Sequence, residues 1–154
     1  MAIGPVTKFN QLEQVIMSTT GTDWDSVAAG SFMFILVGNL YTPDVTHTVT
    51  GDLTDIITAG DGAPINVPTP AIDILSVPGT TFLSSGSANF GTTVTITTKF
   101  LICINPLAAA TFSATTSKLL WYVDLDDATG TAERSSTNSD FVINTPANGW
   151  LSYT

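Results

Sequence analysis

The stretch SFMFILVGNLYTPD, residues 31–44, contains six consecutive apolar side chains, from Phe32 to Val37. A run of this length with a glycine at each end is typical of a strand buried on both faces, because it is too short for a core helix. The strand must end before Pro43, since proline has no N–H to donate to a sheet and holds the preceding residue in an extended conformation. We therefore expect residues 32–37 to form the central strand of a sheet.

Several other segments show the period-two alternation or the short apolar runs of strands. The clearest alternation runs from Thr92 to Ile104, and KLLWYVD, from Lys118 to Asp124, is a second strongly apolar segment. Further strands are expected at residues 45–50, 53–58, 71–77, 108–114, 140–144 and 149–153, with a loop or edge strand at 59–70 and a polar loop at 133–139. The segment 108–114 is also compatible with a short helix.

One short amphipathic helix is expected over residues 8–17. Phe9, Leu12 and Ile16 fall on one helical face, and Thr7 is a suitable N-cap residue. Many short strands with one helix predict an all-β fold, a β-sandwich of jelly-roll type with one short N-terminal helix. Residues 7–154 would form this single domain, and residues 1–6 would form an apolar arm in front of it.

Charge composition excludes several classes of partner. The 154-residue chain carries 13 acidic and 4 basic side chains, a formal net charge of −9. Four scattered cations do not make the basic stripe that binds DNA or RNA, nor a patch that binds an anionic membrane surface. No apolar run reaches the roughly 20 residues of a spanning helix, and the N-terminal segment is too polar for a signal peptide. We expect neither a nucleic-acid nor a membrane partner.

The residues that carry enzyme chemistry do not form a recognisable motif. His47 is the only histidine, so a Ser-His-Asp or Cys-His arrangement would have to use it, yet no G-x-S-x-G motif occurs. Cys103, the only cysteine, lies in an apolar segment where a thiol is usually inert, and alone it forms no internal disulfide. Glycine-rich phosphate-binding motifs are also missing from the sequence. We expect a protein that is not an enzyme and needs no cofactor.

Carboxylates occur in two groups. Asp124, Asp126 and Asp127 precede Gly130, but this spacing departs from the calcium-loop pattern, so a solvated turn is favoured over a metal site. Asp23 and Asp25 flank Trp24 and are the candidate pair for glycoside hydrolysis, an alternative that little else in the chain supports. We expect no metal site.

The three tryptophans allow two interpretations. Trp24, Trp121 and Trp150 would form a platform for stacking on a sugar if they were exposed together. Trp121 lies inside an apolar strand, however, so anchoring of the core or of an interface is favoured.

Several short segments together resemble a family of small virion proteins of tailed bacteriophages. In chain order the resembling segments are Phe9-Asn10, Asp23-Trp24-Asp25, Tyr41-Thr42-Pro43-Asp44 with His47, residues 119–125, Asp140-Phe141-Val142-Ile143 and Gly149-Trp150-Leu151. The sequence departs from the family between residues 51 and 70, where the family usually has Gly-Tyr-Thr and paired glycines.

The resemblance implies a structural protein of the virion, a decoration or cement protein that binds the major capsid protein at the capsid surface. Such proteins commonly act as homo-oligomers, trimers or dimers. The apolar arm then becomes the candidate contact with the capsid or a neighbouring subunit, through Ile3, Pro5 and Val6. The alternatives are a receptor- or glycan-binding module on a tail or fibre, which would use exposed aromatic side chains, and a minor tail or connector protein.

Overall fold

The computed structural model describes residues 4–17, 31–74, 81–106, 111–126, 133–147 and 149–153. These residues form antiparallel sheets and one short helix, α1 (Leu12–Met17). The prediction of an all-β fold with a short N-terminal helix is therefore confirmed. The strand order given below does not establish the jelly-roll arrangement.

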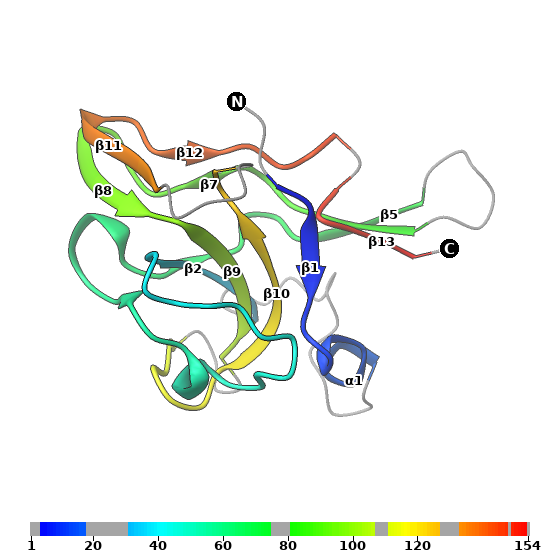
Figure 1. Ribbon diagram of the computed structural model, residues 1–154. Helices are drawn as coiled ribbons and strands as arrows, with labels where there is room; N and C mark the ends of the chain where they lie inside the picture. Colours follow the sequence, from blue (N-terminus) through cyan, green and yellow to red (C-terminus); the bar gives the residue numbers. More distant parts are fainter. Residues whose placement is uncertain are drawn as a thin grey trace.

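The main sheet is built around β2 (Met33–Val37), all of whose side chains are buried. Its strand order is β1-β10-β9-β2-β3, with β4 pairing along β2 beside β3. The other strands of this sheet are β1 (Val6–Lys8), β3 (Ile56–Ile57), β4 (Ile65–Asn66), β9 (Phe100–Asn105) and β10 (Lys118–Asp124). The strand expected over residues 32–37 is present as β2, an interior strand between β9 and the β3 and β4 edge, whereas β9 is the middle strand of the order. The strand β10 has the bounds predicted for it (Figure 1).

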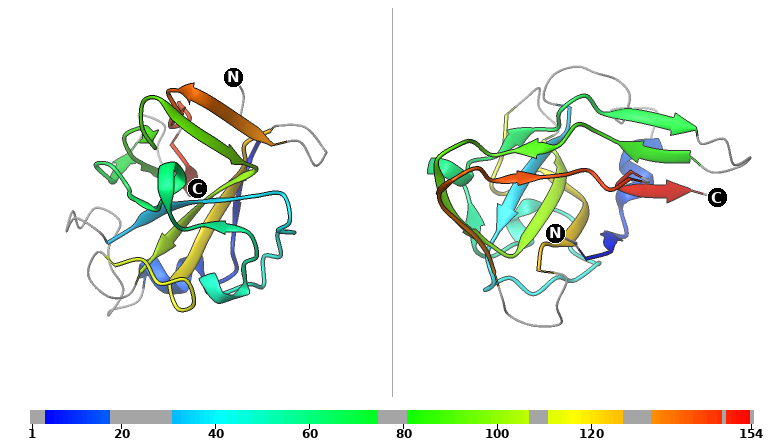
Figure 2. Two further views of the ribbon diagram at one scale, coloured as in Figure 1. Left: turned by 90° about the vertical axis from the view of Figure 1, so that its left-hand side faces the viewer. Right: turned by 90° about the horizontal axis from the view of Figure 1, so that it is seen from above.

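A long interrupted ribbon forms the second layer. One side of the ribbon is β6 (Thr81–Ser84), β7 (Ala88–Asn89) and β8 (Val94–Thr98). The other side is β11 (Arg134–Ser139), β12 (Val142–Ile143) and β13 (Leu151–Tyr153), and it runs antiparallel to the first. The strand β5 (Ala71–Ile74) adds to β6. Seen from above, the ribbon crosses the main sheet, and β8 passes directly into β9 (Figure 2). The chain thus changes layers at the bend between these two strands.

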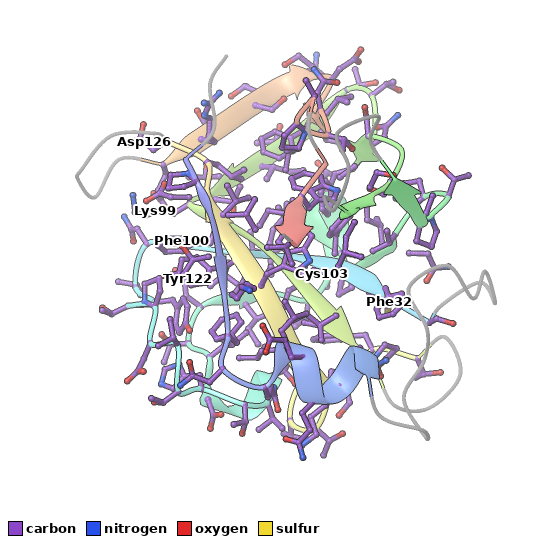
Figure 3. The ribbon with its side chains drawn as sticks, turned by 90° about the vertical axis from the view of Figure 1, so that its right-hand side faces the viewer. Phe32, Lys99, Phe100, Cys103, Tyr122 and Asp126 are labelled. Carbon is purple, nitrogen blue, oxygen red and sulfur yellow. The ribbon has the colours of Figure 1, made fainter. Side chains whose placement is uncertain are left out.

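The larger hydrophobic cluster lies between the ribbon and the main sheet. The sheet contributes Phe34, Cys103 and Trp121, and the ribbon segments contribute Ile96 and Trp150, among others. The rings of Trp121 and Trp150 stack with their centroids 4.9 Å apart. Side chains fill the space between the layers (Figure 3). Burial of the tryptophans supports the core interpretation for Trp121 and Trp150; Trp24 lies outside the described residues.

A second cluster occupies the opposite face of the main sheet. Its sheet residues include Ile35, Ile102 and Leu119, and it is covered by Tyr41 and Leu53 from the long connection between β2 and β3. The single-turn 3-10 helix Thr50–Asp52 lies within this connection. A β-bulge in β10 between Leu119 and Trp121 puts Leu120 and Trp121 on the ribbon side together. Both faces of the sheet are therefore buried, as the continuous apolar run of β2 predicted.

Several predicted elements are wrong or have different bounds. Residues 45–50 are not a strand, because the carboxylates of Asp44 and Asp52 accept the backbone N–H groups of Thr46, Thr48 and Val49. Residues 133–139 are not a loop, since Arg134–Ser139 pairs with β8. The expected strand over residues 92–104 divides at a bend into β8 and β9, and segment 59–70 contains the short strand β4. Residues 108–110 of the ambiguous segment 108–114 lie outside the described residues, and residues 111–114 form neither a helix nor a strand.

The N-terminal segment also differs from the prediction. Thr7 lies in β1 and does not cap the helix, which begins at Leu12. Within the described part of the proposed arm, Val6 pairs with Val123 of β10, and the Gly4 N–H donates to the Asp124 carbonyl (2.8 Å). Residues 4–6 therefore lie along the domain's own sheet, because the edge of β10 offers them backbone partners.

Candidate interaction surfaces

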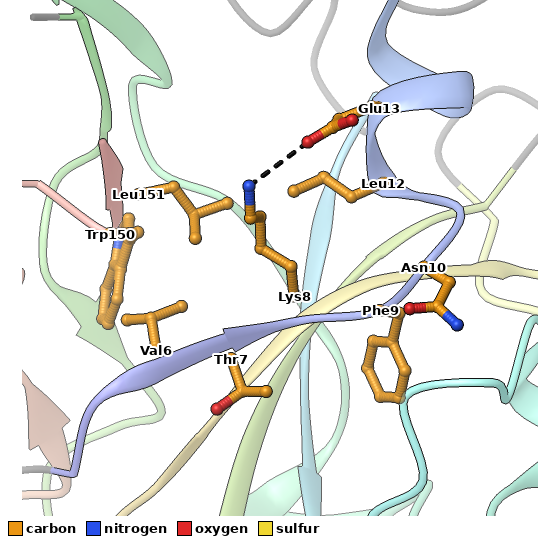
Figure 4. A pocket seen from close by; sticks show the side chains of 9 residues that line it. All are labelled: Val6, Thr7, Lys8, Phe9, Asn10, Leu12, Glu13, Trp150 and Leu151. Carbon is orange, nitrogen blue, oxygen red and sulfur yellow. Dashed lines mark hydrogen bonds and ion pairs between the residues drawn. The ribbon is translucent and has the colours of Figure 1, made fainter. Parts of the chain in front are cut away.

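A groove of about 660 Å³ lies between β1, α1 and the start of β13. Val6, Leu12, Trp150 and Leu151 line it (Figure 4). The Lys8 ammonium and the Glu13 carboxylate form an exposed ion pair across its rim, 3.2 Å between Nζ and Oε1. Since this pair cancels its own charge and faces water, it contributes little to stability. Thr7, Asn10 and the ion pair also line the groove, so its accessible lining is more polar than apolar, with no net charge from the pair.

The three predicted contact residues have different positions. Val6 is half-buried, packs against the larger cluster and lines the groove. Pro5 is exposed, just before β1. Ile3 lies outside the described residues. Of the predicted contacts, the structure brings Val6 to the groove and leaves Pro5 accessible beside β1.

A second surface is the turn that follows β2, which we call the Leu40 turn (residues 38–41 with Thr54 and Asp55). The Leu40 side chain is 78% exposed. Its backbone N–H donates to Oδ2 of Asp55 (3.2 Å), and its carbonyl accepts from the Thr54 hydroxyl (3.2 Å). The neighbouring Asn39 N–H donates to Glu133 (3.3 Å). The turn thus presents an exposed leucine on a fixed backbone, with carboxylates on either side.

His47 belongs to a corner near this turn. Its Nδ1 lies 2.9 Å from the hydroxyl of Tyr41, whose ring is buried. Burial raises the pKa of the Tyr41 hydroxyl to about 12. Cys103 packs into the cluster on the other face of the sheet, and its own burial raises the pKa of its thiol well above the usual range. The main sheet therefore separates the only histidine from the only thiol.

The carboxylates near His47 accept hydrogen bonds from backbone N–H groups. Oδ1 of Asp44 accepts from the Thr46 N–H (2.8 Å) and hydroxyl (2.7 Å). These bonds, with the Thr46 side-chain bond the largest cause, lower the pKa of Asp44. Oδ2 of Asp52 accepts from the N–H groups of Thr48 and Val49, which lowers its pKa in the same way. These aspartates act as turn caps, a role that sequence spacing alone did not reveal.

The acidic end of β10 is not a calcium loop in the described part. Asp124 forms an ion pair with Lys99, and the Asp126 N–H donates to Oδ1 of Asp124 (2.9 Å). Asp127 and Gly130 lie outside the described residues, as do Asp23 and Asp25. Among the residues that the structure describes, no three histidine, cysteine or acidic side chains gather as a metal site would need.

Trp150 does not form part of an exposed sugar platform. It is 3% exposed, and its Nε1 donates to the Ser85 hydroxyl (2.9 Å). The Lys99–Asp124 pair was missed in the sequence because the two residues lie 25 positions apart. In the sequence, the one indication of a buried pair is the position of Lys99 within a segment expected to be a strand. In the structure, its neighbours Thr98 and Phe100 are both buried.

No family model, curated protein sequence or solved structure matches the chain. Within the described ranges, no helix is long and apolar enough to cross a membrane. Function must therefore be inferred from the resemblance of short sequence segments and from the surfaces described above.

Proposed function

We propose that the chain is a non-enzymatic structural protein of a tailed-phage virion, a decoration protein that binds the major capsid protein on the outer surface of the head. The proposal begins from the sequence resemblance to the virion protein family. A decoration protein needs a rigid body with a fixed contact surface, because its affinity for the capsid comes from contact area and from copy number.

The Leu40 turn is the observation that carries the proposal. An exposed leucine on a backbone fixed at both its N–H and its carbonyl loses little conformational freedom when it enters a pocket of a partner. The adjoining carboxylates of Asp55 and Glu133 favour a partner with basic side chains around that pocket.

Charge across the rest of the molecule favours the same kind of partner. Lys8 is paired with Glu13, Lys99 is buried against Asp124, and Nε of Arg134 donates to the Leu125 carbonyl. Three of the four basic side chains are thus engaged within the chain, whereas Asp44, Asp52 and Asp55 stand on turns. A basic capsid surface would complement this distribution, and binding would weaken as salt concentration rises.

Co-sedimentation with undecorated capsids tests the proposal. We expect saturable binding in a fixed ratio to the shell protein and a loss of at least about tenfold in affinity for Leu40→Ser, the size of a truncated anchor residue. Val142→Ser is the matched control, because Val142 is 43% exposed on β12, away from the turn. No binding of the wild-type chain to capsids would refute the decoration role.

The N-terminal contact is tested separately. A chain without residues 1–3 loses Ile3 but keeps Gly4 and Val6, which hold β1 to β10. We expect weaker capsid binding from this chain and from Pro5→Asp, with unchanged unfolding midpoints. Unchanged capsid occupancy in both variants would show that the capsid contact does not use this N-terminal segment.

Light scattering on the purified protein measures its oligomeric state and so tests the proposed dimer or trimer.

A further inference from the structure

Lys99 occupies the bend where the chain passes from the ribbon into the main sheet. Its backbone N–H donates to the Val37 carbonyl (2.9 Å), and its carbonyl accepts from the Leu125 N–H (2.8 Å). The backbone of this lysine is therefore fixed between β2 and β10. Its side chain is only 8% exposed, and the ammonium lies 5.4 Å from the centre of the Phe100 ring. A lysine amine is thus held in one place, largely out of water.

The amine lies against the carboxyl group of Asp124, at the end of β10. Nζ of Lys99 is 3.0 Å from Oδ2 and 3.4 Å from Oδ1, so it is close to the carboxyl carbon that the two oxygens share. The Asp126 N–H donates to that same Oδ1 (2.9 Å). This donor would stabilise negative charge that develops on Oδ1 if the carbon were attacked.

Asp126, whose backbone N–H donates to Asp124, also carries a carboxyl group. Its Oδ2 is buried and has no hydrogen-bond partner among the described residues. Asp126, Lys99, Phe100 and Tyr122 follow one another along one side of the molecule (Figure 3). A buried carboxyl oxygen without a hydrogen-bond partner carries a cost in free energy. The ion pair between Lys99 and Asp124 does not by itself explain why this Asp126 oxygen is buried.

We propose that Lys99 and Asp124 condense to an intramolecular isopeptide bond. A proton leaves the Lys99 ammonium for the Asp124 carboxylate, and the neutral amine attacks Cγ of Asp124 to form the N–C bond. The oxygen that accepts the Asp126 N–H carries the negative charge of the tetrahedral intermediate. The Asp126 carboxyl group donates its proton to the departing hydroxyl and regains one from the nitrogen. The C–O bond breaks, one water leaves, and no oxidant or co-reactant is consumed.

Fixed geometry makes this condensation reasonable in water. Well-oriented groups react with effective concentrations of about 10⁵–10⁸ M, which offsets the excess of water that favours hydrolysis of a free amide. The product would be a covalent link at the corner between the two layers. It does not depend on the proposed role in the virion.

The mass of the purified, denatured full-length chain tests the proposal. We expect it to be lower than the sequence mass by one water molecule. Trypsin should then fail to cleave after Lys99, so that peptide 9–118 is recovered joined to peptide 119–134. Lys99→Arg and Asp124→Ala should both have their full sequence masses and should be cleaved at the other basic residues as usual.

Two further variants separate the reaction from a structural ion pair. Asp124→Asn should form the same bond with loss of ammonia in place of water. Asp126→Asn retains the N–H donor but has no acidic proton, so its bond formation should be about 10²- to 10⁴-fold slower. A folded wild-type chain with the full sequence mass would overturn the proposal. Unslowed bond formation in Asp126→Asn would overturn the role of Asp126.

Discussion

The two faces of the main sheet are covered by different kinds of structure. The ribbon covers one face, and its contacts with the sheet are made by large apolar side chains such as Trp150 and Phe141. The connection from β2 to β3 covers the other face, and much of its backbone is not in any ladder. There, the carboxylates of Asp52 and Asp55 accept hydrogen bonds from backbone N–H groups that would otherwise donate to carbonyls of a neighbouring strand.

This difference indicates where the stability of each cover originates. Burial of apolar area is non-directional and large, so the ribbon side should be sensitive to loss of volume. Hydrogen bonds that backbone N–H groups donate to exposed carboxylates are directional and are weakened by solvent, so the opposite cover should be sensitive to geometry and to pH. Three substitutions test this contrast.

Trp150→Ala should have the largest effect. The Trp150 ring stacks on Trp121 and meets Phe34 edge-on, with ring centroids 5.6 Å apart. Its removal leaves a cavity in the centre of the ribbon side and should lower the free energy of unfolding by about 3–5 kcal/mol. Trp150→Phe retains most of the ring contact and loses the bond to Ser85, so it should cost distinctly less. Equal losses in urea unfolding of the two variants would assign the stability to the hydrogen bond.

Gly38→Ala should have an intermediate effect on the other cover. A Cβ at this position would overlap with Oδ2 of Asp55, the oxygen that accepts the Leu40 N–H. The carboxylate must move and the bond to Leu40 is lost, a cost of about 1–3 kcal/mol. In an Asp55→Ala background the same substitution should cost much less. An equal cost in both backgrounds, measured by urea unfolding, would show that the close approach to Asp55 does not restrict this position.

The central part of the fold could be predicted because its sequence signals are strong and local. The apolar runs of β2 and β10 occur where the chain is buried on both faces, and both strands were predicted. The alternating valines and threonines of residues 45–50 gave a false strand signal, because Asp44 and Asp52 hold that backbone in turns. The polar residues of β11 concealed a strand, because pairing with β8 depends on backbone groups more than on hydrophobic side chains.

The candidate sites were less predictable, since they depend on long-range contacts. Burial of Cys103 and Trp121 could be inferred from their apolar neighbours. The proximity of Lys99 to Asp124 required knowledge of the bend between β8 and β9, which no local pattern marks. The exposed position of Leu40 likewise follows from the turn held by Asp55 and not from the sequence around it.

The smallest effect is expected from Asp52→Asn, and it should depend on pH. Hydrogen bonds from the backbone of Thr48 and Val49 lower the pKa of Asp52 below its ordinary value of 3.8. A lowered pKa in the folded state means that the charged form contributes stability above pH 3.8 and that this contribution disappears as pH falls through the folded-state pKa. Because Asp52 is exposed, we expect a contribution of at most about 1 kcal/mol at neutral pH. Unfolding measured from neutral pH to below pH 3.8 should show the Asp52→Asn variant losing less stability with acid than the wild type. Parallel pH profiles would mean that the charge of Asp52 does not stabilise this cover and that apolar packing secures both faces of the sheet.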